Sequence, residues 1–279
     1  MQSDHYAVIG HPVAHSLSPR IHARFAQQTG QRLDYLAIEA PLDGFAALAR
    51  ARLSADLAGA NVTVPFKAEA CALADRVEPR AARAGAVNTL RREADGSLTG
   101  FNTDGPGLVR DLTVNLDCDL RGLKVVLVGA GGAAAGVVEM LCEAGVAQLY
   151  IANRTAARAR ALAARFLSSG PVRACELDAV PVADLIVNAT AASLAGAVPA
   201  LPERAVCART LAYDMMYAAS ATPFMDWAHT RGARRCADGL GMLVEQAAEA
   251  FLLWRGVRPD TTSVLRELRP AVRLERRAP

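Results

Sequence analysis

Three short segments in the first half of the chain carry side chains that could take part in the reduction of a carbonyl group. The segment "GANVTVPFK" contains Asn61, Thr63 and Lys67, and the segments "GAVNTL" and "GFNTDGPG" add Asn88 and Asp104. Amides and hydroxyls can orient the hydroxyl groups of a polyhydroxylated substrate, and a lysine beside a carboxylate can pass a proton to a carbonyl oxygen. Taken singly, each segment also fits ordinary turn chemistry, because Asn, Asp and Gly dominate turns.

The segment "HPVAHSLSPR" follows a short apolar run that ends at Gly10. Ser18 before Pro19 predicts a helix N-cap followed by proline at the first helical position. A turn of this kind does not require His15 or Ser16, and loops between strands and helices often carry the sites of α/β proteins. Two interpretations therefore stay open, a ligand-binding loop and a plain turn.

The segment "VGAGGAA" fits the pattern G-x-G-x-x-A through Gly129, Gly131 and Ala134, between an apolar strand and a helix. Glycines let backbone N–H groups approach a pyrophosphate, and the helix N-terminus adds partial positive charge. The alternative is a tight turn in a glycine-rich chain. The strand-turn-helix context favours a dinucleotide site.

The next expected strand, in "AQLYIANRT", should end beside the adenosine ribose, where NAD enzymes place an acidic residue. Here the chain has Asn153, Arg154 and Thr155, with Arg158 one helical turn further on. A carboxylate would repel a ribose 2′-phosphate, whereas guanidinium groups bind it with forked hydrogen bonds. The pattern predicts NADP rather than NAD.

The elements that must position these residues alternate between strands and helices, which is typical of an α/β fold with a mostly parallel sheet. A second domain is expected to open at Leu123, where a continuous apolar strand leads into the glycine turn. A last helix ends at Gly256, and its periodicity does not say which half it packs against. In the first half we expect strands at 6–9, 33–38 and 59–64, and helices at 19–28, 44–51 and 67–73.

Composition excludes several classes of function. The 279 residues are 52% hydrophobic and 21% charged, as in globular proteins, and the net charge of +3 is scattered, so nothing supports nucleic-acid binding. The six cysteines are isolated from one another and predict free thiols in a reducing cytoplasm, with no metal site. The first residues lack the features of a signal peptide, and the longest apolar stretch is too short to span a bilayer.

The sequence resembles the shikimate dehydrogenases of the shikimate/quinate dehydrogenase family over nearly its whole length. The resemblance is carried by nine segments in the family's order and spacing: "GHPVAHSLSPRIH", "GANVTVPFK", "GAVNTL", "NTDGPG", "GAGGAA", "NRT", "NAT", "YDMMY" and "ADGLGMLVEQAAEAF". It implies two α/β domains with the reaction in the cleft between them. A discontinuous substrate domain would comprise residues 1–104 and 239–279, and a Rossmann-type NADP-binding domain with a parallel sheet would comprise residues 105–238.

The resemblance also implies roles for individual residues. Lys67 is similar to the family's proton-transfer residue, and Asp104 to the carboxylate that holds this lysine and a ring hydroxyl. Ser16 and Ser18 would bind the substrate carboxylate, and Ser18 is typical of shikimate-selective members. Further substrate contacts would be Asn61, Thr63, Asn88, Tyr217 and Gln246. The cofactor would contact Gly129, Ala130, Gly131, Gly132 and Ala133 with its phosphates, Asn153, Arg154, Thr155 and Arg158 with its 2′-phosphate, and Met215 and Gly239 with its nicotinamide side.

The expected activity is reversible NADPH-dependent reduction of 3-dehydroshikimate to shikimate in the cytoplasmic route to chorismate and the aromatic amino acids. Partners would be this small-molecule substrate and the cofactor, with no nucleic acid and no membrane, in a monomer or a homodimer. Two alternatives remain. A quinate/shikimate paralogue with relaxed cofactor choice is disfavoured by Ser18 and Arg154, and a silent member that senses shikimate or NADP is disfavoured by the presence of Lys67 and Asp104.

Overall fold

The computed structural model describes residues 3–275. Contacts divide this part of the chain into two compact units. The first unit runs to Gly107 and resumes over Leu243–Val264, and the second comprises Leu108–Met242 and continues from Leu265. Residues 1–2 and 276–279, which belong to the expected substrate domain, lie outside the described residues.

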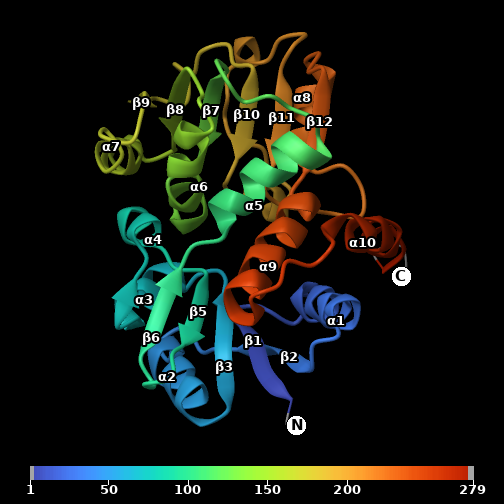
Figure 1. Cartoon of the computed structure of the whole chain (residues 1–279). Coiled ribbons are helices and arrows are strands. Elements are labelled where there is room, and N and C mark those ends of the chain that lie inside the picture. The colour runs from blue at the N-terminus through green and yellow to red at the C-terminus, as the bar shows by residue number, and fades with distance from the viewer. Residues whose placement is uncertain (1–2, 276–279) are drawn as a thin grey trace. The chain divides into compact units, whose positions relative to one another are not determined.

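The first unit is built on a six-stranded mixed sheet in the order β2-β1-β3-β5-β6-β4 (Figure 1). Strand β1 is parallel to β2 and β3, as the alternating pattern predicts, whereas β5 is antiparallel to both β3 and β6. The strands are β1 (Asp4–Gly10), β2 (Leu33–Glu39), β3 (Leu57–Val62), β4 (Arg76–Val77), β5 (Thr89–Arg92) and β6 (Leu98–Phe101).

Helices cover this sheet and form its core with the strands. Ile9 and Leu90 from the sheet are fully buried together with Phe45 and Phe66, whose rings stack at 4.8 Å. Full burial of such side chains stabilises the fold by roughly 1.5–3 kcal/mol each. The helices are α1 (Ser18–Thr29), α2 (Phe45–Ala55), α3 (Lys67–Leu73) and α4 (Pro79–Ala84).

The second unit is a doubly wound fold. Its six strands lie in the order β12-β11-β10-β7-β8-β9 with every pairing parallel, and Figure 1 shows them side by side. The strand order reverses between β7 and β10, the position where such folds bind ligands. The expected Rossmann-type parallel sheet is confirmed. The strands are β7 (Lys124–Val128), β8 (Gln148–Ala152), β9 (Val172–Cys175), β10 (Leu185–Asn188), β11 (Leu211–Asp214) and β12 (Arg235–Asp238).

Helices join the strands of the second unit, and three helices carry the chain from one unit to the other. No helix within residues 3–275 combines the length and the apolar character needed to cross a membrane. Helices α6 (Gly132–Glu143), α7 (Ala156–Ala164) and α8 (Pro223–Thr230) belong to the second unit. The crossings occur within α5 (Asp104–Arg110), α9 (Leu240–Arg255) and α10 (Thr261–Glu275).

The part of α9 in the first unit packs against the mixed sheet, which answers the question that its periodicity leaves open. Trp254 stacks on Tyr6 with ring centroids 4.6 Å apart, and its indole Nε1 donates a 3.1 Å hydrogen bond to the Leu90 carbonyl. Gly59 makes this contact possible, because a Cβ there would lie 2.5 Å from the indole nitrogen. This part of α9 therefore contributes to the core of the first unit.

Candidate active site

Two helix starts bring the expected proton-transfer residues together in the first unit. Lys67 is the first residue of α3, anchored by the fully buried Phe66. Asp104 begins α5 rather than lying in a turn, and its backbone N–H donates to the side chain of Asn102 at 3.0 Å. Asn102 in turn donates to the Ala86 carbonyl at 2.8 Å.

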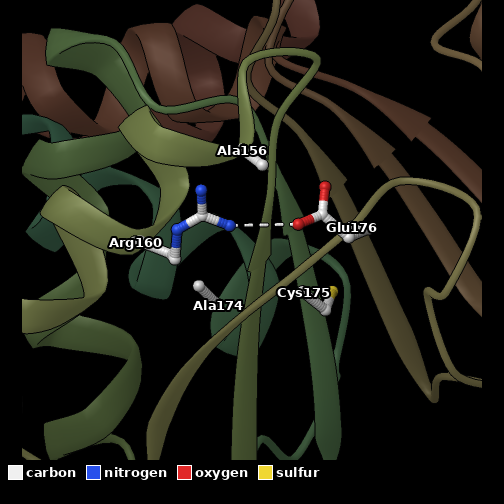
Figure 2. Close-up of a pocket in the computed structure, with 5 residues that line it drawn as sticks. All are labelled: Ala156, Arg160, Ala174, Cys175 and Glu176. Carbon is white, nitrogen blue, oxygen red and sulfur yellow. Dashed lines mark hydrogen bonds and ion pairs between the residues drawn. The ribbon is translucent and has the colours of Figure 1, made fainter.

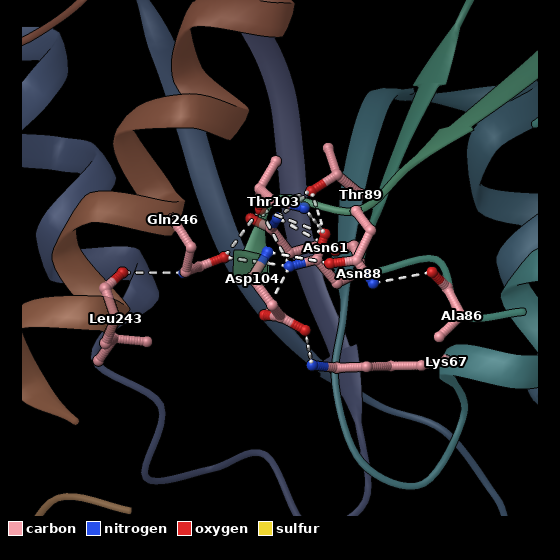
Figure 3. Close-up of polar contacts among 10 residues, drawn as sticks. Asn61, Lys67, Ala86, Asn88, Thr89, Thr103, Asp104, Leu243 and Gln246 are labelled. Carbon is pink, nitrogen blue, oxygen red and sulfur yellow. Dashed lines mark hydrogen bonds and ion pairs between the residues drawn. The ribbon is translucent and has the colours of Figure 1, made fainter. Parts of the chain in front are cut away.

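Lys67 and Asp104 form a close ion pair. The Lys67 Nζ lies 2.5 Å from Asp104 Oδ2, and the two side chains are 14% and 7% exposed (Figure 3). Charge-assisted hydrogen bonds of this kind are short and strong, and partial burial reduces their screening by water. The pair thus places a proton donor at a fixed point beside an anion.

Asn88 fixes the other oxygen of the same carboxylate. Its Nδ2 donates to Asp104 Oδ1 at 2.9 Å, while its Oδ1 accepts the Thr103 N–H at 2.8 Å and the Thr89 hydroxyl at 3.0 Å. The Nδ2 of Asn88 thus faces a carboxylate and its Oδ1 faces two donors, so the orientation of the amide is defined. Asn88 is 3% exposed, so few of its hydrogen bonds can be exchanged with water.

Gln246 reaches this cluster from α9. Its Oε1 faces the Thr103 hydroxyl at 3.3 Å and the Asn88 amide at 3.4 Å, and its Nε2 donates to the Leu243 carbonyl at 2.9 Å (Figure 3). The approach requires glycine at position 107, where a Cβ would lie 2.6 Å from the Gln246 Cβ.

Asn61 is hydrogen-bonded to the cluster and to Tyr35 through its side chain. Its Oδ1 accepts the Tyr35 hydroxyl at 2.6 Å, and its Nδ2 donates to Thr89 Oγ1 at 3.0 Å and to the Asn88 carbonyl at 3.2 Å. Its side chain is expected to contact substrate, and these bonds suit it equally to holding Asn88 and Thr89 in place.

The loop serines lie at the start of α1. The expected N-cap role of Ser18 is wrong, because α1 begins at Ser18 and Leu17 occupies the cap position. Ser18 donates its N–H to Ser16 Oγ at 3.2 Å, which leaves the Ser16 hydroxyl hydrogen available to another acceptor. Thr63 packs against Gly10, where a Cβ would lie 2.3 Å from its methyl group.

The glycine turn of the second unit fits a pyrophosphate. Gly129 has a φ of 121° and lies close to the Ala189 carbonyl, so a side chain there would be strained. Gly131 precedes α6, and nothing lies within 4 Å of the position its Cβ would take. Gly129 donates its own N–H to the Ala152 carbonyl at 2.8 Å, whereas Ala130, Gly131, Gly132 and Ala133 lie at the start of a 12-residue helix, whose first backbone N–H groups can bind phosphate.

Two arginines follow β8 where the 2′-phosphate is expected. Arg154 and Arg158 are exposed, and within residues 3–275 neither forms an ion pair. Asn153 holds the turn by donating from Nδ2 to the Thr155 carbonyl at 3.0 Å, and Thr155 occupies the N-cap position of α7. This arrangement can bind a doubly charged phosphate.

A cavity of about 170 Å³ adjoins these residues at the start of α7. Figure 2 shows Arg160 and Glu176 reaching across it to form an ion pair of 3.1 Å. Ala156, Ala174 and Cys175 complete its lining. Burial raises the pKa of Cys175 to about 11, so this thiol stays protonated near neutral pH.

Met215 and Gly239 lie against each other at the ends of β11 and β12. The Met215 N–H donates to the Asn188 carbonyl at 2.9 Å, and a Cβ on Gly239 would lie 2.2 Å from the Met215 carbonyl oxygen. Tyr217 follows in the same loop and is half-buried. The second unit therefore holds every residue expected to contact the cofactor, and the expected substrate residues other than Tyr217 lie in the first unit.

Family models match three consecutive parts of the chain. A "Shikimate dehydrogenase substrate binding domain" matches residues 8–90, "Shikimate / quinate 5-dehydrogenase" matches residues 112–215, and "Shikimate 5'-dehydrogenase C-terminal domain" matches residues 239–269. The shikimate dehydrogenase (NADP(+)) of Aromatoleum aromaticum is 56% identical over 274 residues, which cover 96% of this chain and 98% of the relative. The chain belongs to the shikimate dehydrogenase family.

Two solved structures have the same fold as this chain. The shikimate 5-dehydrogenase of Thermus thermophilus, in complex with NADP(H) and shikimate, is 38% identical with a TM-score of 0.85, over 96% of this chain and 99% of that one. An Ael1 enzyme from Pseudomonas putida is 46% identical with a TM-score of 0.89, over 95% and 98% of the two chains.

Two further residues, Thr89 and Tyr35, support the site and were not predicted to belong to it, whereas Thr103 lies in the predicted segment "GFNTDGPG". Thr103 and Thr89 orient Asn88, and the Tyr35 hydroxyl binds Asn61. Burial raises the pKa of Tyr35 well above its usual value, so the hydroxyl remains a donor. The "NTD" segment gave a signal for Thr103, whereas Tyr35 lies in an ordinary strand. No group of His, Cys, Asp and Glu within residues 3–275 could hold a metal ion.

Proposed function

We propose that this chain catalyses the reversible NADPH-dependent reduction of 3-dehydroshikimate to shikimate, a step in the formation of chorismate and the aromatic amino acids. Relatives named shikimate dehydrogenase (NADP(+)) at more than half identity support the activity. The single observation that carries the mechanism is the buried contact between Lys67 and Asp104. A silent sensor would have no need of this pair.

Lys67 acts as the proton donor to the carbonyl oxygen. NADPH, when bound, supplies the hydride to the carbonyl carbon. The Lys67 ammonium gives its proton to the oxygen as negative charge develops there, and the neutral amine takes a proton back in the reverse direction. Asp104 stabilises the ammonium before transfer, and Asn88 keeps the carboxylate oriented by occupying its second oxygen.

The remaining polar residues bind and orient the substrate. Ser16 and Ser18 hold its carboxylate. The 3.2 Å hydrogen bond from the Ser18 N–H to Ser16 Oγ, which brings the two residues together, and the available hydroxyl hydrogen of Ser16 support this role. Gln246, Thr63 and Asn88 bind ring hydroxyls, while Tyr217 serves the carboxylate end. Amides and hydroxyls at fixed positions align the ring so that only one carbonyl faces the lysine.

The second unit binds NADP. The glycine turn from Gly129 to Ala133 holds the pyrophosphate, Arg154 and Arg158 bind the 2′-phosphate, and Met215 and Gly239 contact the nicotinamide side. The two exposed guanidinium groups support NADP over NAD. Without a bound 2′-phosphate, both positive charges would lie unbalanced at a helix start, where the helix dipole opposes them. The expected domains, residues 1–104 and 239–279 for substrate and 105–238 for cofactor, differ from the two units at their boundaries, because the units group 105–107 with the substrate residues and group 239–242 and the chain from Leu265 with the cofactor residues. We place the reaction in the cytoplasm, supported by the free thiols of the described cysteines.

The test is the change in nicotinamide absorbance with purified protein, measured for shikimate and quinate against NADP and NAD. Turnover chiefly with shikimate and NADP is expected. Comparable efficiency with quinate or NAD would make the chain a relaxed paralogue. Binding of NADP without turnover of either acid would contradict the enzymatic proposal and favour a sensor.

A further inference from the structure

Asp214 is a buried carboxylate at the carboxyl end of β11, directly before the expected nicotinamide contact Met215. Its side chain is fully buried with 0% exposure. In the described part of the chain no cationic group pairs with it. An uncompensated buried charge is costly, so its hydrogen bonds must account for its presence.

Four donors surround this carboxylate. The hydroxyls of Ser193 and Thr222 donate to Oδ2 at 2.6 and 2.7 Å, and the Asn188 amide and the Met216 N–H donate to Oδ1, both at 3.1 Å. An ionised carboxylate offers about four acceptor sites, and here each oxygen accepts two bonds. Burial raises the pKa of Asp214, and these four hydrogen bonds oppose the rise by stabilising the charged form.

The donors come from separate segments of the second unit. Ser193 lies in the short 3-10 helix Ala192–Ala195, and Thr222 is the N-cap of α8. Asn188 is the register partner of Asp214 on the neighbouring strand β10. Asp214 therefore ties the loop after β10 to the loop after its own strand.

The loop after β11 carries Met215, which is expected on the nicotinamide side, and it bonds to Gly239, the other expected residue, in the loop after β12. Met215 donates its N–H to the Asn188 carbonyl at 2.9 Å, and Gly239 donates its N–H to the Met216 carbonyl at 3.0 Å. The Met216 N–H bond to Asp214 fixes the peptide that links these contacts. Tyr217 follows immediately in the chain.

We propose that Asp214 is a positioning residue for the nicotinamide half of the cofactor, holding the Met215–Tyr217 loop in the shape that this half requires. The inference rests on the proposed binding of NADP by the second unit. The proposed role distinguishes the two ends of the cofactor site. Asp214 affects the nicotinamide end, whereas the glycine turn and Arg154 bind phosphates without involving Asp214.

Titration calorimetry of Asp214→Asn with NADP and with adenosine 2′,5′-bisphosphate, which lacks nicotinamide, tests the role. Asparagine keeps the shape of the side chain, and the Ser193 and Thr222 hydroxyls can rotate to accept hydrogen bonds from its amide N–H groups. We expect affinity for NADP to fall about tenfold, the size of one lost charge-assisted hydrogen bond, and affinity for the bisphosphate to stay unchanged. The matched control is Asp226→Asn, a carboxylate exposed on α8, which should bind both nucleotides like the parent protein.

Ser193→Ala is the second variant and removes one donor outside the sheet, so it tests the proposal if Asp214→Asn does not fold. It should show the same selective loss for NADP. An equal loss for both nucleotides would overturn the proposal, because a purely structural residue damages the whole site. Unchanged binding of both nucleotides to folded variants would also overturn it. Failure of the parent protein to bind either nucleotide would instead contradict the proposed function on which the inference rests.

Discussion

Lys67 and Asn88 bind different oxygens of the same carboxylate. Lys67 Nζ engages Asp104 Oδ2 at 2.5 Å, and Asn88 Nδ2 engages Oδ1 at 2.9 Å. With both oxygens held, rotation of the carboxylate breaks at least one strong bond. The position of the ammonium is therefore set by Asn88 as well as by Asp104, and the orientation of Asn88 is set by its bonds to Thr89 and Thr103.

Replacing Lys67 with alanine should remove the proton donor while leaving the substrate-binding groups in place. We expect kcat to fall by about 10²–10⁴, the usual contribution of general acid-base catalysis. Steady-state kinetics with shikimate and NADP, together with calorimetric binding of shikimate, measure the two effects. Turnover at the parental rate with binding retained would exclude Lys67 as the proton-transfer residue.

Removal of the arginines after β8 should change cofactor choice. In a variant with Arg154→Ala and Arg158→Ala, loss of charge-assisted bonds to the 2′-phosphate should raise the KM for NADP by about 10- to 100-fold. The KM for NAD should change little. Arg173→Ala removes an exposed charge from β9 and serves as the control for net charge. An equal loss for both cofactors would rule out a 2′-phosphate site here.

Local patterns predicted the elements that carry strong periodicity. The expected helix over 67–73 coincides with α3, and the glycine turn lies between β7 and α6 as expected. The strands β5 and β6 are four residues each, which is too short for alternation to stand out against neighbouring turns. The antiparallel part of the first sheet was therefore not foreseen.

The polar cluster was only partly predictable for a different reason. Asn88 and Gln246 are 158 positions apart and meet only in the folded chain. Tyr35 gives no local signal, because a half-buried aromatic residue is ordinary in a strand. Sequence motifs thus identify the residues that could do chemistry, while the residues that orient them depend on tertiary packing.

Gly131 offers a test of the pyrophosphate site that separates binding from folding. Its φ of −91° suits alanine, and nothing lies within 4 Å of the added Cβ, so Gly131→Ala should cost no more than about 1 kcal/mol of stability at this cap position. The methyl group would occupy the space expected for phosphate. We expect markedly weaker NADP binding by calorimetry with a nearly unchanged melting temperature. Full affinity in a folded variant would contradict the placement of the phosphates.

His22 should make the stability of the protein depend on pH. It is fully buried and stacks on Tyr35 at 4.2 Å, and burial lowers its pKa from 6.5 to about 3. The native state keeps this histidine neutral where the unfolded chain protonates it. The contribution of His22 to the free energy of unfolding is therefore fully present above the unfolded pKa of 6.5 and is lost as the pH falls toward the native pKa of about 3.

The variant His22→Phe cannot protonate and fits a site already lined by Phe25, Phe251 and Trp254. Between about pH 7.5 and about pH 5, the parent protein should lose about 2 kcal/mol of unfolding free energy relative to this variant. Urea denaturation of both proteins at the two pH values gives the difference directly, because all other titrating groups are shared. Parallel loss of stability in both proteins would mean that His22 is protonated in the native state and that the aromatic stack accepts its charge.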